Sequence, residues 1–570
     1  MLPQGTTTDQ RGNLYTVGTF FQSTPIDFDP GPGGTPIATA GNTDGFVQRL
    51  DADGNLDWVY TFGGTFNDGV SAVTADGYGN IYVCGFFTGT IDVDPGPGVT
   101  SLTSAPGPFI NGFVLKLDTA GQFVWAKNTG SAITAIDIDP SGNILLAGEF
   151  ANGAIDFDPG PAVATLTTNG GLDIFYQKLD PQGNLIWVKS IGGTTNSDRA
   201  LGLVSDDAGN IYSTGSFRDT VDFDPGVGTS SLFGEGTSDG YLLKLDSSGN
   251  FQWANRFGGS GADVSTSIDL DAAGNPYVTG RFMNTVDFDP GSGVANRTAP
   301  GFNDVFVLKT DTAGNYQWVN TLRGTNYAQG TRLLFDVDDN LFVLSRFADT
   351  VDIDPGAGVT MQVAQGDQDF LLQQLDVNGN VLTTLPFGGI QTDDALLLSA
   401  DSAGYLYMVG HFQSTVDFDP GPGVANLTTA ANDNVFFLKL FHCVTQYGNL
   451  QASACGSYTS PSGNFTWSAS GTYTDMLMNG NGCDSVVAVH LTILNSDTTL
   501  VAIACDTYTA PSGQVFTSSG TYQDIIPNVA GCDSVIAIQL TVSGSTNASL
   551  NAVACDAYTT PGGTVLTASG

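Results

Sequence analysis

The feature that most constrains the fold of this chain is a motif that occurs seven times at a nearly constant interval. The motif reads D-F-D-P-G or a close variant, and its copies follow Ile26, Ile91, Ile155, Val221, Val286, Val351 and Val416. Successive copies lie 64 to 66 residues apart. Such a period indicates a repeat protein, in which each repeat forms one supersecondary unit and packs against its neighbours.

Each unit contains four short runs rich in Val, Ile, Tyr and Phe, the pattern of antiparallel strands. In the fourth unit these runs cover residues 201–205, 211–217, 241–245 and 251–257. The tight-turn sequence D-x-x-G-N joins the first run to the second and the third to the fourth, while D-F-D-P-G lies in the longer middle connection. Seven units of four strands predict an all-β fold, a seven-bladed β-propeller over residues 1–441, with an open solenoid as the alternative.

The seventh unit is incomplete. After Lys439 and Leu440 the sequence has neither a Gly-Asn turn nor a tryptophan, so we expect three strands in the last blade. We expect residues upstream of Met1 in a longer protein to supply the fourth strand. Five earlier units carry a tryptophan in the fourth run, and these are Trp58, Trp125, Trp187, Trp253 and Trp318. No basic residues are interleaved with them, so we expect them to pack between blades.

A second repeat, of 50 residues, begins at Cys455, Cys505 and Cys555. We assign residues 442–453 to a linker, 454–496 and 497–546 to two Cys-containing β-modules, and 547–570 to a truncated third module. Cys455 and Cys483 are 28 residues apart, and Cys505 and Cys532 are 27 apart. We therefore expect each module to close its own disulfide.

The remaining cysteines have no counterpart at module spacing. Cys555 lacks a second cysteine in its module, and Cys443 stands at the junction of the two repeats, so the sequence assigns neither of them a partner. Cys84 replaces a Val or Thr of the sister blades, which predicts a buried thiol.

These motifs resemble those of known families. Units with G-N-I-Y-V-x-G-x-F and D-F-D-P-G resemble the bacterial seven-bladed β-propeller repeat over about three quarters of the chain. The A-C-D-x-Y-T-x-P-S-G modules are similar to the Cys-containing modules near the C-termini of surface proteins exported by the type IX secretion system. The first resemblance implies a fold but no activity, because one fold hosts many functions. The second implies export.

The paired aspartates of the repeated motif allow two interpretations. In an extended chain both side chains point the same way, about 6.6 Å apart, which suits the oxygen ligands of Ca²⁺. In the alternative, the aspartates cap the turn and the residue between them fills the blade. Both interpretations remain open, and no other cofactor is expected. The candidate calcium ligands are Asp27, Asp29, Asp92, Asp94, Asp156, Asp158, Asp222, Asp224, Asp287, Asp289, Asp352, Asp354, Asp417 and Asp419.

The net charge and the cysteines limit the partners and the cellular compartment expected for the protein. The net charge of −40 argues against nucleic acid and anionic membranes as partners. The sequence shows neither a signal peptide nor an apolar run of about 18 residues, so we expect no membrane insertion. Disulfides in small modules indicate an oxidising compartment. We expect a monomeric propeller within a longer chain, secreted or on the outer surface of a bacterium.

The sequence offers no catalytic constellation. Its three histidines, His411, His442 and His490, have no metal-like or triad-like spacing. We therefore expect a non-catalytic binding or adhesion protein that presents an acidic propeller face, with Asp68, Asp198, Asp263 and Asp393, to a glycan, protein or matrix. The alternative is a secreted polysaccharide hydrolase or lyase with its site at the central mouth. Its nearest candidates are Arg281, Arg346 and His411.

Overall fold

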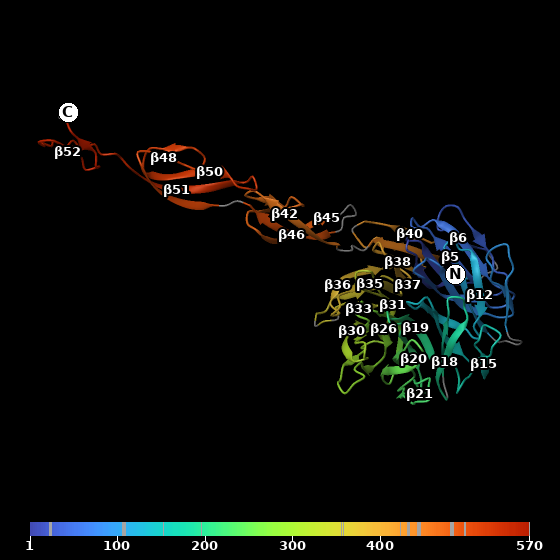
Figure 1. Cartoon of the computed structure of the whole chain (residues 1–570). Helices are drawn as coiled ribbons and strands as arrows, with labels where there is room; N and C mark the ends of the chain where they lie inside the picture. The colour runs from blue at the N-terminus through green and yellow to red at the C-terminus, as the bar shows by residue number, and fades with distance from the viewer. Residues whose placement is uncertain are drawn as a thin grey trace. The chain divides into compact units, whose positions relative to one another are not determined.

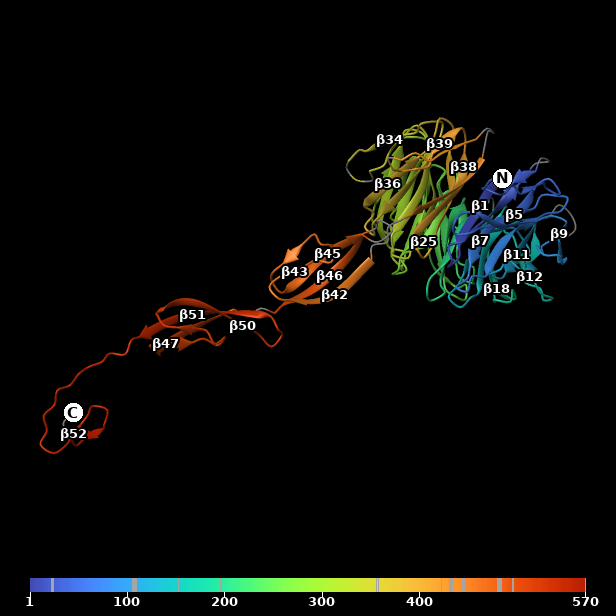
Figure 2. The same cartoon turned by 90° about the horizontal axis from the view of Figure 1, so that it is seen from above.

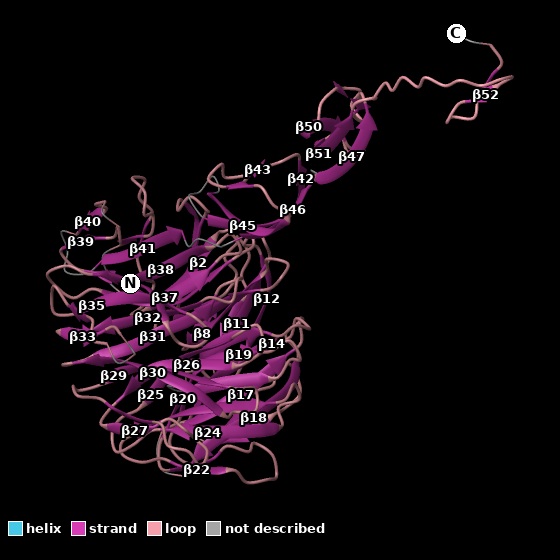
Figure 3. Cartoon of the chain, turned by 90° about the vertical axis from the view of Figure 1, so that its left-hand side faces the viewer, coloured by secondary structure: helices cyan, strands magenta, loops and turns pink. Residues whose placement is uncertain are grey.

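The computed structural model consists of strands, turns and loops (Figure 3). It describes residues 1–570 except 22–24, 105–109, 152, 195–196, 355, 357, 422, 430–433, 442–445, 479–483, 495–496 and 569–570. Within these residues no helix has the length and hydropathy needed to cross a membrane. The chain forms two compact units, Met1–His442 and Cys443–Gly570.

The first unit is a seven-bladed β-propeller, as the repeat predicts (Figure 1). Blades one to six are four-stranded antiparallel sheets, with strands called A to D in chain order. These strands are β1 (Leu2–Thr8), β2 (Leu14–Phe20), β5 (Asp44–Leu50) and β6 (Leu56–Phe62); β7 (Gly69–Ala75), β8 (Ile81–Phe87), β11 (Asn111–Leu117) and β12 (Phe123–Asn128); β13 (Ile133–Ile138), β14 (Ile144–Phe150), β17 (Asp173–Leu179) and β18 (Leu185–Gly193); β19 (Arg199–Ser205), β20 (Ile211–Phe217), β23 (Asp239–Leu245) and β24 (Phe251–Phe257); β25 (Val264–Leu270), β26 (Pro276–Phe282), β29 (Asp304–Thr310) and β30 (Tyr316–Gly324); and β31 (Ala328–Phe335), β32 (Leu341–Phe347), β35 (Asp369–Leu375) and β36 (Val381–Phe387).

Blade seven has three strands among the described residues, which confirms the expected missing strand. They are β37 (Asp394–Ala400), β38 (Tyr405–Phe412) and β41 (Asn434–Phe441). Strand A of each blade contacts strand A of the next, and β1 also contacts β37 of blade seven. The sheets therefore close into a ring, and Figure 2 shows the first blade in blue beside the orange strands of the seventh.

The A-to-B and C-to-D turns form as their D-x-x-G-N sequence predicts. In the turn at Asp206 the carboxylate Oδ1 accepts hydrogen bonds from the backbone N–H groups of Ala208 and Asn210. Gly209 adopts a φ of 77°, a conformation that favours glycine. The aspartate therefore satisfies the donors of the turn, and the glycine permits its backbone conformation.

The long B-to-C connections fold back as small two-stranded hairpins that hold the D-F-D-P-G motif. The hairpins pair β3 (Ile26–Asp27) with β4 (Pro36–Ile37), β9 (Thr90–Asp92) with β10 (Ser101–Thr103), β15 (Ala154–Asp156) with β16 (Thr165–Thr167), β21 (Thr220–Asp222) with β22 (Ser231–Phe233), β27 (Thr285–Asp287) with β28 (Asn296–Thr298), β33 (Thr350–Asp352) with β34 (Met361–Val363), and β39 (Thr415–Asp417) with β40 (Asn426–Thr428). Several hairpins also pair with the end of strand D of the preceding blade, for example β21 with β18 and β33 with β30. The repeated motif thus joins neighbouring blades.

The strand-D tryptophans make a second contact between blades. The indole Nε1 of Trp187 donates to the backbone oxygen of Ser247 in the next C-to-D turn at 3.4 Å, and Lys178 Nζ donates to the same oxygen at 3.0 Å. Trp253 and Trp318 repeat this contact one and two blades further on. This confirms the expectation that the tryptophans pack between blades.

The same contact explains part of the turn sequence. The turn glycine of the next blade lies against the indole ring, so that a Cβ added to Gly121 would lie 2.8 Å from Trp58. Gly54 occupies the equivalent place after blade seven, which has no tryptophan, and a Cβ there would meet no atom within 4 Å. Lys439 still donates to the oxygen of Ala52 across this joint, at 2.7 Å.

Most hydrophobic clusters of the propeller lie between two blades, although Phe20, Phe28 and Phe46 form one within blade one. One cluster joins Tyr15 and Val47 of blade one to Val83 and Phe113 of blade two. Another joins Leu14 and Leu50 of blade one to Leu397, Tyr407 and Val409 of blade seven. The Cys84 side chain is fully buried, as predicted, and burial raises the pKa of its thiol.

The second unit contains two modules with the same topology and a short third segment. The modules consist of β42 (Gln446–Ala454), β43 (Tyr458–Thr459), β44 (Thr466–Trp467), β45 (Gly471–Met478) and β46 (Asp484–Ile493), and of β47 (Thr498–Cys505), β48 (Tyr508–Thr509), β49 (Val515–Phe516), β50 (Gly520–Pro527) and β51 (Asp533–Ser543). The third segment holds β52 (Tyr558–Thr559) and β53 (Val565–Leu566). In each module the first and last strands run parallel.

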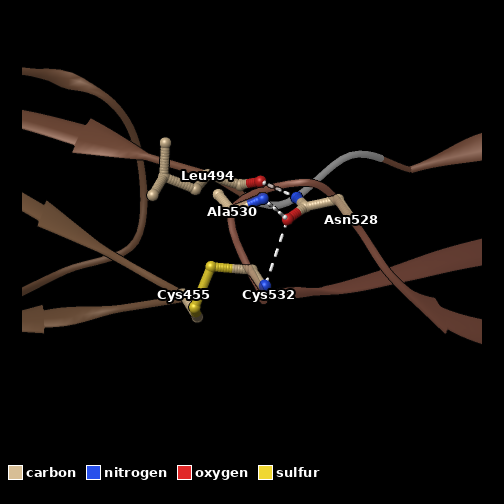
Figure 4. The surroundings of a disulfide bond; sticks show 5 residues. All are labelled: Cys455, Leu494, Asn528, Ala530 and Cys532. Carbon is tan, nitrogen blue, oxygen red and sulfur yellow. Dashed lines mark hydrogen bonds between the residues drawn. A yellow bond between two sulfur atoms is a disulfide. The ribbon is translucent and has the colours of Figure 1, made fainter.

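The disulfide pairing expected within each module is wrong. The structure joins Cys455 of the first module to Cys532 of the second, and Cys505 and Cys555 are free and exposed (Figure 4). Parallel pairing explains this, because Cys505 is the register partner of Ser543 at one end of β51, while Cys532 precedes the other end. Along a strand of 11 residues these ends are roughly 35 Å apart, far beyond disulfide reach. Cys443 and Cys483 lie outside the described residues.

The linker assigned to residues 442–453 is also wrong in its described part, because β42 covers Gln446–Ala454 and pairs with β46. The first module therefore begins before the assigned residue 454, whereas in the second module β47 (Thr498–Cys505) lies within the assigned range 497–546. Asn528 adds a further contact between the modules, since its Nδ2 donates to the backbone oxygen of Leu494 at 2.6 Å (Figure 4).

Candidate functional site

The paired aspartates of the D-F-D-P-G motif act inside their own loops. In blade seven, Asp417 Oδ1 accepts hydrogen bonds from the backbone N–H groups of Asp419 and Ala425, at 3.0 and 2.8 Å. Asp419 Oδ1 accepts one from Gly421 at 2.7 Å. These bonds favour the charged carboxylate, and those from Ala425 and Asp419 lower the pKa of Asp417. Phe418 between them is buried, as predicted.

The same pattern recurs around the ring. The first aspartate of the pair accepts from the residue two positions ahead and from the one eight positions ahead, and the second accepts from the glycine two ahead. Among the described residues, no group of three or more His, Cys, Asp or Glu side chains is arranged to hold a metal. The geometry therefore supports the turn-capping interpretation, and calcium stays a prediction for all fourteen aspartates.

The acidic face expected from the sequence needs one correction. Asp68, Asp198, Asp263 and Asp393 do not lie on the surface, because each is at most 1% exposed. Asp263 accepts hydrogen bonds from the backbone N–H groups of Gly259 and Met283, both at 2.8 Å. These aspartates therefore fix the passage from strand D to the next strand A against the B-to-C hairpin.

A second set of buried aspartates begins strand C and explains the first glycine of the Gly-Gly pair, which four of the passages carry. Asp239 is fully buried, and a Cβ added to Gly258 would collide with its carboxylate. Burial raises the pKa of Asp263, Asp198 and Asp369 to about 6 and that of Asp304 to about 7. Buried carboxylates thus recur around the ring, but each is enclosed and held by backbone donors.

Two of the three candidates for a catalytic mouth contact the next blade. Arg346 Nη1 donates to Asp394 Oδ2 at 2.6 Å, and Arg346 Nη2 donates to Gln329 Oε1 at 3.1 Å. Arg281 Nη1 contacts the same Gln329 oxygen at 3.4 Å, and His411 is the register partner of Asp394. All three lie at the end of strand B opposite the start of strand A, and the contacts of Arg281 and Arg346 join one blade to the next.

One joint between blades is shorter than the others, and a cavity lies there. The cavity has a volume of about 720 Å³ and lies between blades two and three. Its polar border includes Asn111, Asn128, Ser131, Glu149 and Asp156, and its apolar border includes Ile110, Ile155 and Leu172. It is large enough for a drug-sized or disaccharide-sized ligand.

The cavity arises because the chain is shorter here. Trp125 and the turn residue Asp139 are 14 positions apart, whereas Trp253 and Asp271 are 18 apart. The Gly-Gly pair and the passage aspartate are missing from this joint. The shortened spacing between Trp125 and Asp139 is visible in the sequence and marks this joint, although the repeated motifs alone do not reveal it.

Glu149 is the distinctive side chain of this cavity. It is one of only two glutamates in the chain, the other being Glu235. Its side chain is 17% exposed, and its Oε1 lies 3.8 Å from Arg199 Nε. Burial raises the pKa of Glu149, while the Arg199 charge opposes that shift. The site therefore combines a partly desolvated carboxyl with amide, hydroxyl and apolar surface.

Comparisons with known proteins support a β-propeller repeat protein. No family model matches the chain. It is 23% identical over 403 residues to the uncharacterized WD repeat-containing protein L264 of Acanthamoeba polyphaga mimivirus, covering 60% of this chain and 29% of that protein. It is 25% identical over 453 residues to the regulatory protein FlaEY of Caulobacter vibrioides, covering 65% and 46%.

The chain thus spans less than half the length of either curated relative. A solved protein of unknown function from Bacteroides caccae aligns at 11% identity with a TM-score of 0.14, over 42% of this chain and 93% of that one. This overlap is too low to indicate a shared fold. The structure and the WD-repeat relative together identify the chain as a repeat protein whose first unit is a β-propeller.

Proposed function

We propose that the protein is a non-catalytic binding protein, secreted or held at the outer surface of a bacterium, that recognises a glycan or protein through the B-to-C face of its propeller. The observation that carries this proposal is the cavity between blades two and three, at the one joint where the repeat is shortened. A ring whose other joints keep a nearly constant length gains a concave site there.

The composition of the cavity favours binding over catalysis. Asn128 Oδ1 accepts hydrogen bonds from Asn111 Nδ2 at 3.1 Å and from the backbone N–H of Gly130 at 3.0 Å. Ser131 Oγ donates to the backbone oxygen of Glu149 at 2.8 Å. These contacts hold the amide and hydroxyl groups of the polar border in fixed positions, as a ligand-binding site requires.

The disulfide between the modules supports an extracytoplasmic location, because such bonds persist in oxidising compartments. The proposal includes export by a route like that of the type IX surface proteins, which the modules resemble. In this arrangement the modules carry the propeller away from the cell.

A glycan array and a panel of matrix proteins, probed with the whole chain, test the proposal. We expect retention of a ligand and at least tenfold weaker retention by Glu149→Gln, about 1.4 kcal/mol. Glu235→Gln is the matched control, because Glu235 also faces an arginine, Arg256 at 3.4 Å, but lies outside the cavity. Turnover in a polysaccharide hydrolase and lyase panel, with no retained ligand, would overturn the proposal in favour of the enzyme alternative.

A further inference from the structure

The central channel of the propeller is bordered by strand A of all seven blades and contains a cavity of about 170 Å³. Every strand A carries a β-bulge at the same place, which in blade six lies between Gly330 and Arg332. A bulge leaves one residue unpaired and bends its strand, so the repeated bulge determines which residues border the channel.

Arg332 differs from its equivalents in the other six blades. The residue that directly follows the bulge is in those blades Gly5, Ala72, Ala135, Gly202, Ser267 or Leu397. All six are uncharged and most are small. Blade six therefore places a guanidinium at a position where the rest of the repeat places none.

The guanidinium of Arg332 has few partners. Its Nη1 donates to the backbone oxygens of Thr331 at 3.2 Å and Thr266 at 3.5 Å, both long contacts. A guanidinium has five N–H groups, and in the described part of the chain the others have no protein acceptor. The unpartnered nitrogens Nε and Nη2 are accessible to solvent, and Arg332 borders the cavity of the channel.

Arg332 also lacks a counter-charge. The described ion pairs of the chain, at N···O distances up to 4.0 Å, do not include it, although acidic residues outnumber basic ones 57 to 17. Burial lowers its pKa, and no charged neighbour opposes that shift. Two carboxylates on other A strands, Asp137 and Asp269, accept hydrogen bonds from Ser205 and Phe335.

An uncompensated charge inside a protein is costly, and the cost falls when an ion of opposite sign binds beside it. We propose that the central channel binds one compact anion, with Arg332 as its principal ligand. Gln4 and Ser71 border the same cavity, and Gln4 Oε1 has no hydrogen-bond partner, so its amide can turn a donor toward the anion.

The cavity admits a halide, a phosphate or the carboxylate of a larger ligand. This inference does not depend on the proposed function, because it concerns the A strands and not the B-to-C loops. In the alternative description, the channel is hydrated and the unused donors of Arg332 bind only water.

Crystals of the whole chain soaked in sodium bromide provide the direct test. We expect an anomalous peak within hydrogen-bond distance of the Arg332 guanidinium. In solution, bromide titrated against gluconate at constant sodium concentration should raise the melting temperature of the propeller. Sodium phosphate should compete with bromide for the same site.

The variant Arg332→Leu carries the residue of blade seven at this position and should lose the peak and the bromide-dependent shift. We expect its affinity for bromide to fall by at least about tenfold. Arg297→Leu, on an exposed hairpin strand, is the control and should keep both. If Arg332→Leu does not fold, Arg332→Lys keeps the charge and should retain a weakened response.

A uronate-bearing oligosaccharide and its neutral counterpart distinguish the two sources of the anion. Protection by the uronate alone assigns the anion to a glycan, whereas protection by bromide and phosphate alone assigns it to a free ion. No anomalous peak, together with equal bromide dependence in wild type and Arg332→Leu, would overturn the inference.

Discussion

The propeller and the Cys-containing modules stabilise small β-sheets in two different ways. A propeller blade buries both faces against its neighbours, and its strand B is almost wholly buried, as in β20. A module sheet leaves large apolar side chains in solvent, with Val501 69% and Ile503 79% exposed. In the closed ring, each blade forms a hydrophobic core with its neighbours. The modules bury less apolar surface, and a disulfide between them adds the stability that their small cores lack.

The largest expected effect breaks that covalent bond. Cys455→Ser removes the link to Cys532, which closes a loop of 77 residues. We expect the modules to lose about 4 kcal/mol of unfolding free energy, while the propeller is unaffected. Calorimetry of the whole chain should show only the module transition moving.

Cys505→Ser is the control, because Cys505 is exposed and free in this structure. A shift of equal size in Cys505→Ser, or a shift of the propeller transition in Cys455→Ser, would contradict the assignment of the bond.

The second prediction measures how much the contact between a turn glycine and the tryptophan of the preceding blade contributes to the stability of the propeller. Gly121→Ala and Gly54→Ala both place a Cβ at positive φ, 76° and 85°, but only Gly121 lies against a tryptophan, Trp58. We expect Gly54→Ala to cost about 1–2 kcal/mol from backbone strain alone, and Gly121→Ala to cost about 1–3 kcal/mol more.

Denaturant unfolding of the propeller measures both costs. Equal losses in the two variants would mean that the indole contact contributes nothing and that blade seven differs from the others only in strand number.

The third prediction concerns the pH dependence of stability, which should differ between the propeller and the modules. Burial raises the pKa of Asp304 from 3.8 to about 7, so the folded state keeps its proton where the unfolded state has lost it. The stability that this group contributes is therefore present below pH 3.8 and is lost as the pH rises toward about 7, by at most about 1.4 kcal/mol per pH unit.

Asp304→Asn keeps the oxygen that accepts from the backbone N–H of Gly324 and removes the titration. We expect its propeller melting temperature to fall less than that of wild type between pH 5 and 7, with no change in the modules. A steeper fall in the variant would contradict the sign of this shift.

The smallest expected effect concerns calcium. If all seven motifs bound calcium near its Kd, each would add about 0.4 kcal/mol and the ring about 3 kcal/mol. Because the described carboxylates already accept backbone hydrogen bonds, we expect calcium and a chelator to give propeller melting temperatures within about 1 °C of each other. A rise of several degrees, lost in Asp417→Asn with Asp419→Asn, would instead assign calcium to the motif.

Much of the propeller could be predicted from local sequence, because its contacts repeat. The runs expected at 211–217 and 251–257 correspond to β20 (Ile211–Phe217) and β24 (Phe251–Phe257), and the missing strand of blade seven followed from an absent Gly-Asn turn and tryptophan. Alternation of apolar residues and tight-turn chemistry act over a few residues, so one unit sufficed to describe six others.

The features that the sequence analysis predicted wrongly or missed depend on contacts between distant segments. Cys455 pairs with Cys532 because strands far apart in sequence run parallel, which cysteine spacing does not reveal. Asp68 and its equivalents were placed on a face by topology, but their burial depends on the hairpin that folds over them. Arg332 was overlooked because its isolation is visible only when strand A of all seven blades is aligned by structure.

The sequence by itself determined the number of blades, their strands and which blade lacks a strand, because these depend on periodicity and turn residues that recur in the chain. Only the tertiary structure decided which aspartates are buried, which cysteines meet, and which joint is hollow. Those properties depend on distances between segments separated by tens to hundreds of residues, and a local pattern does not encode such distances.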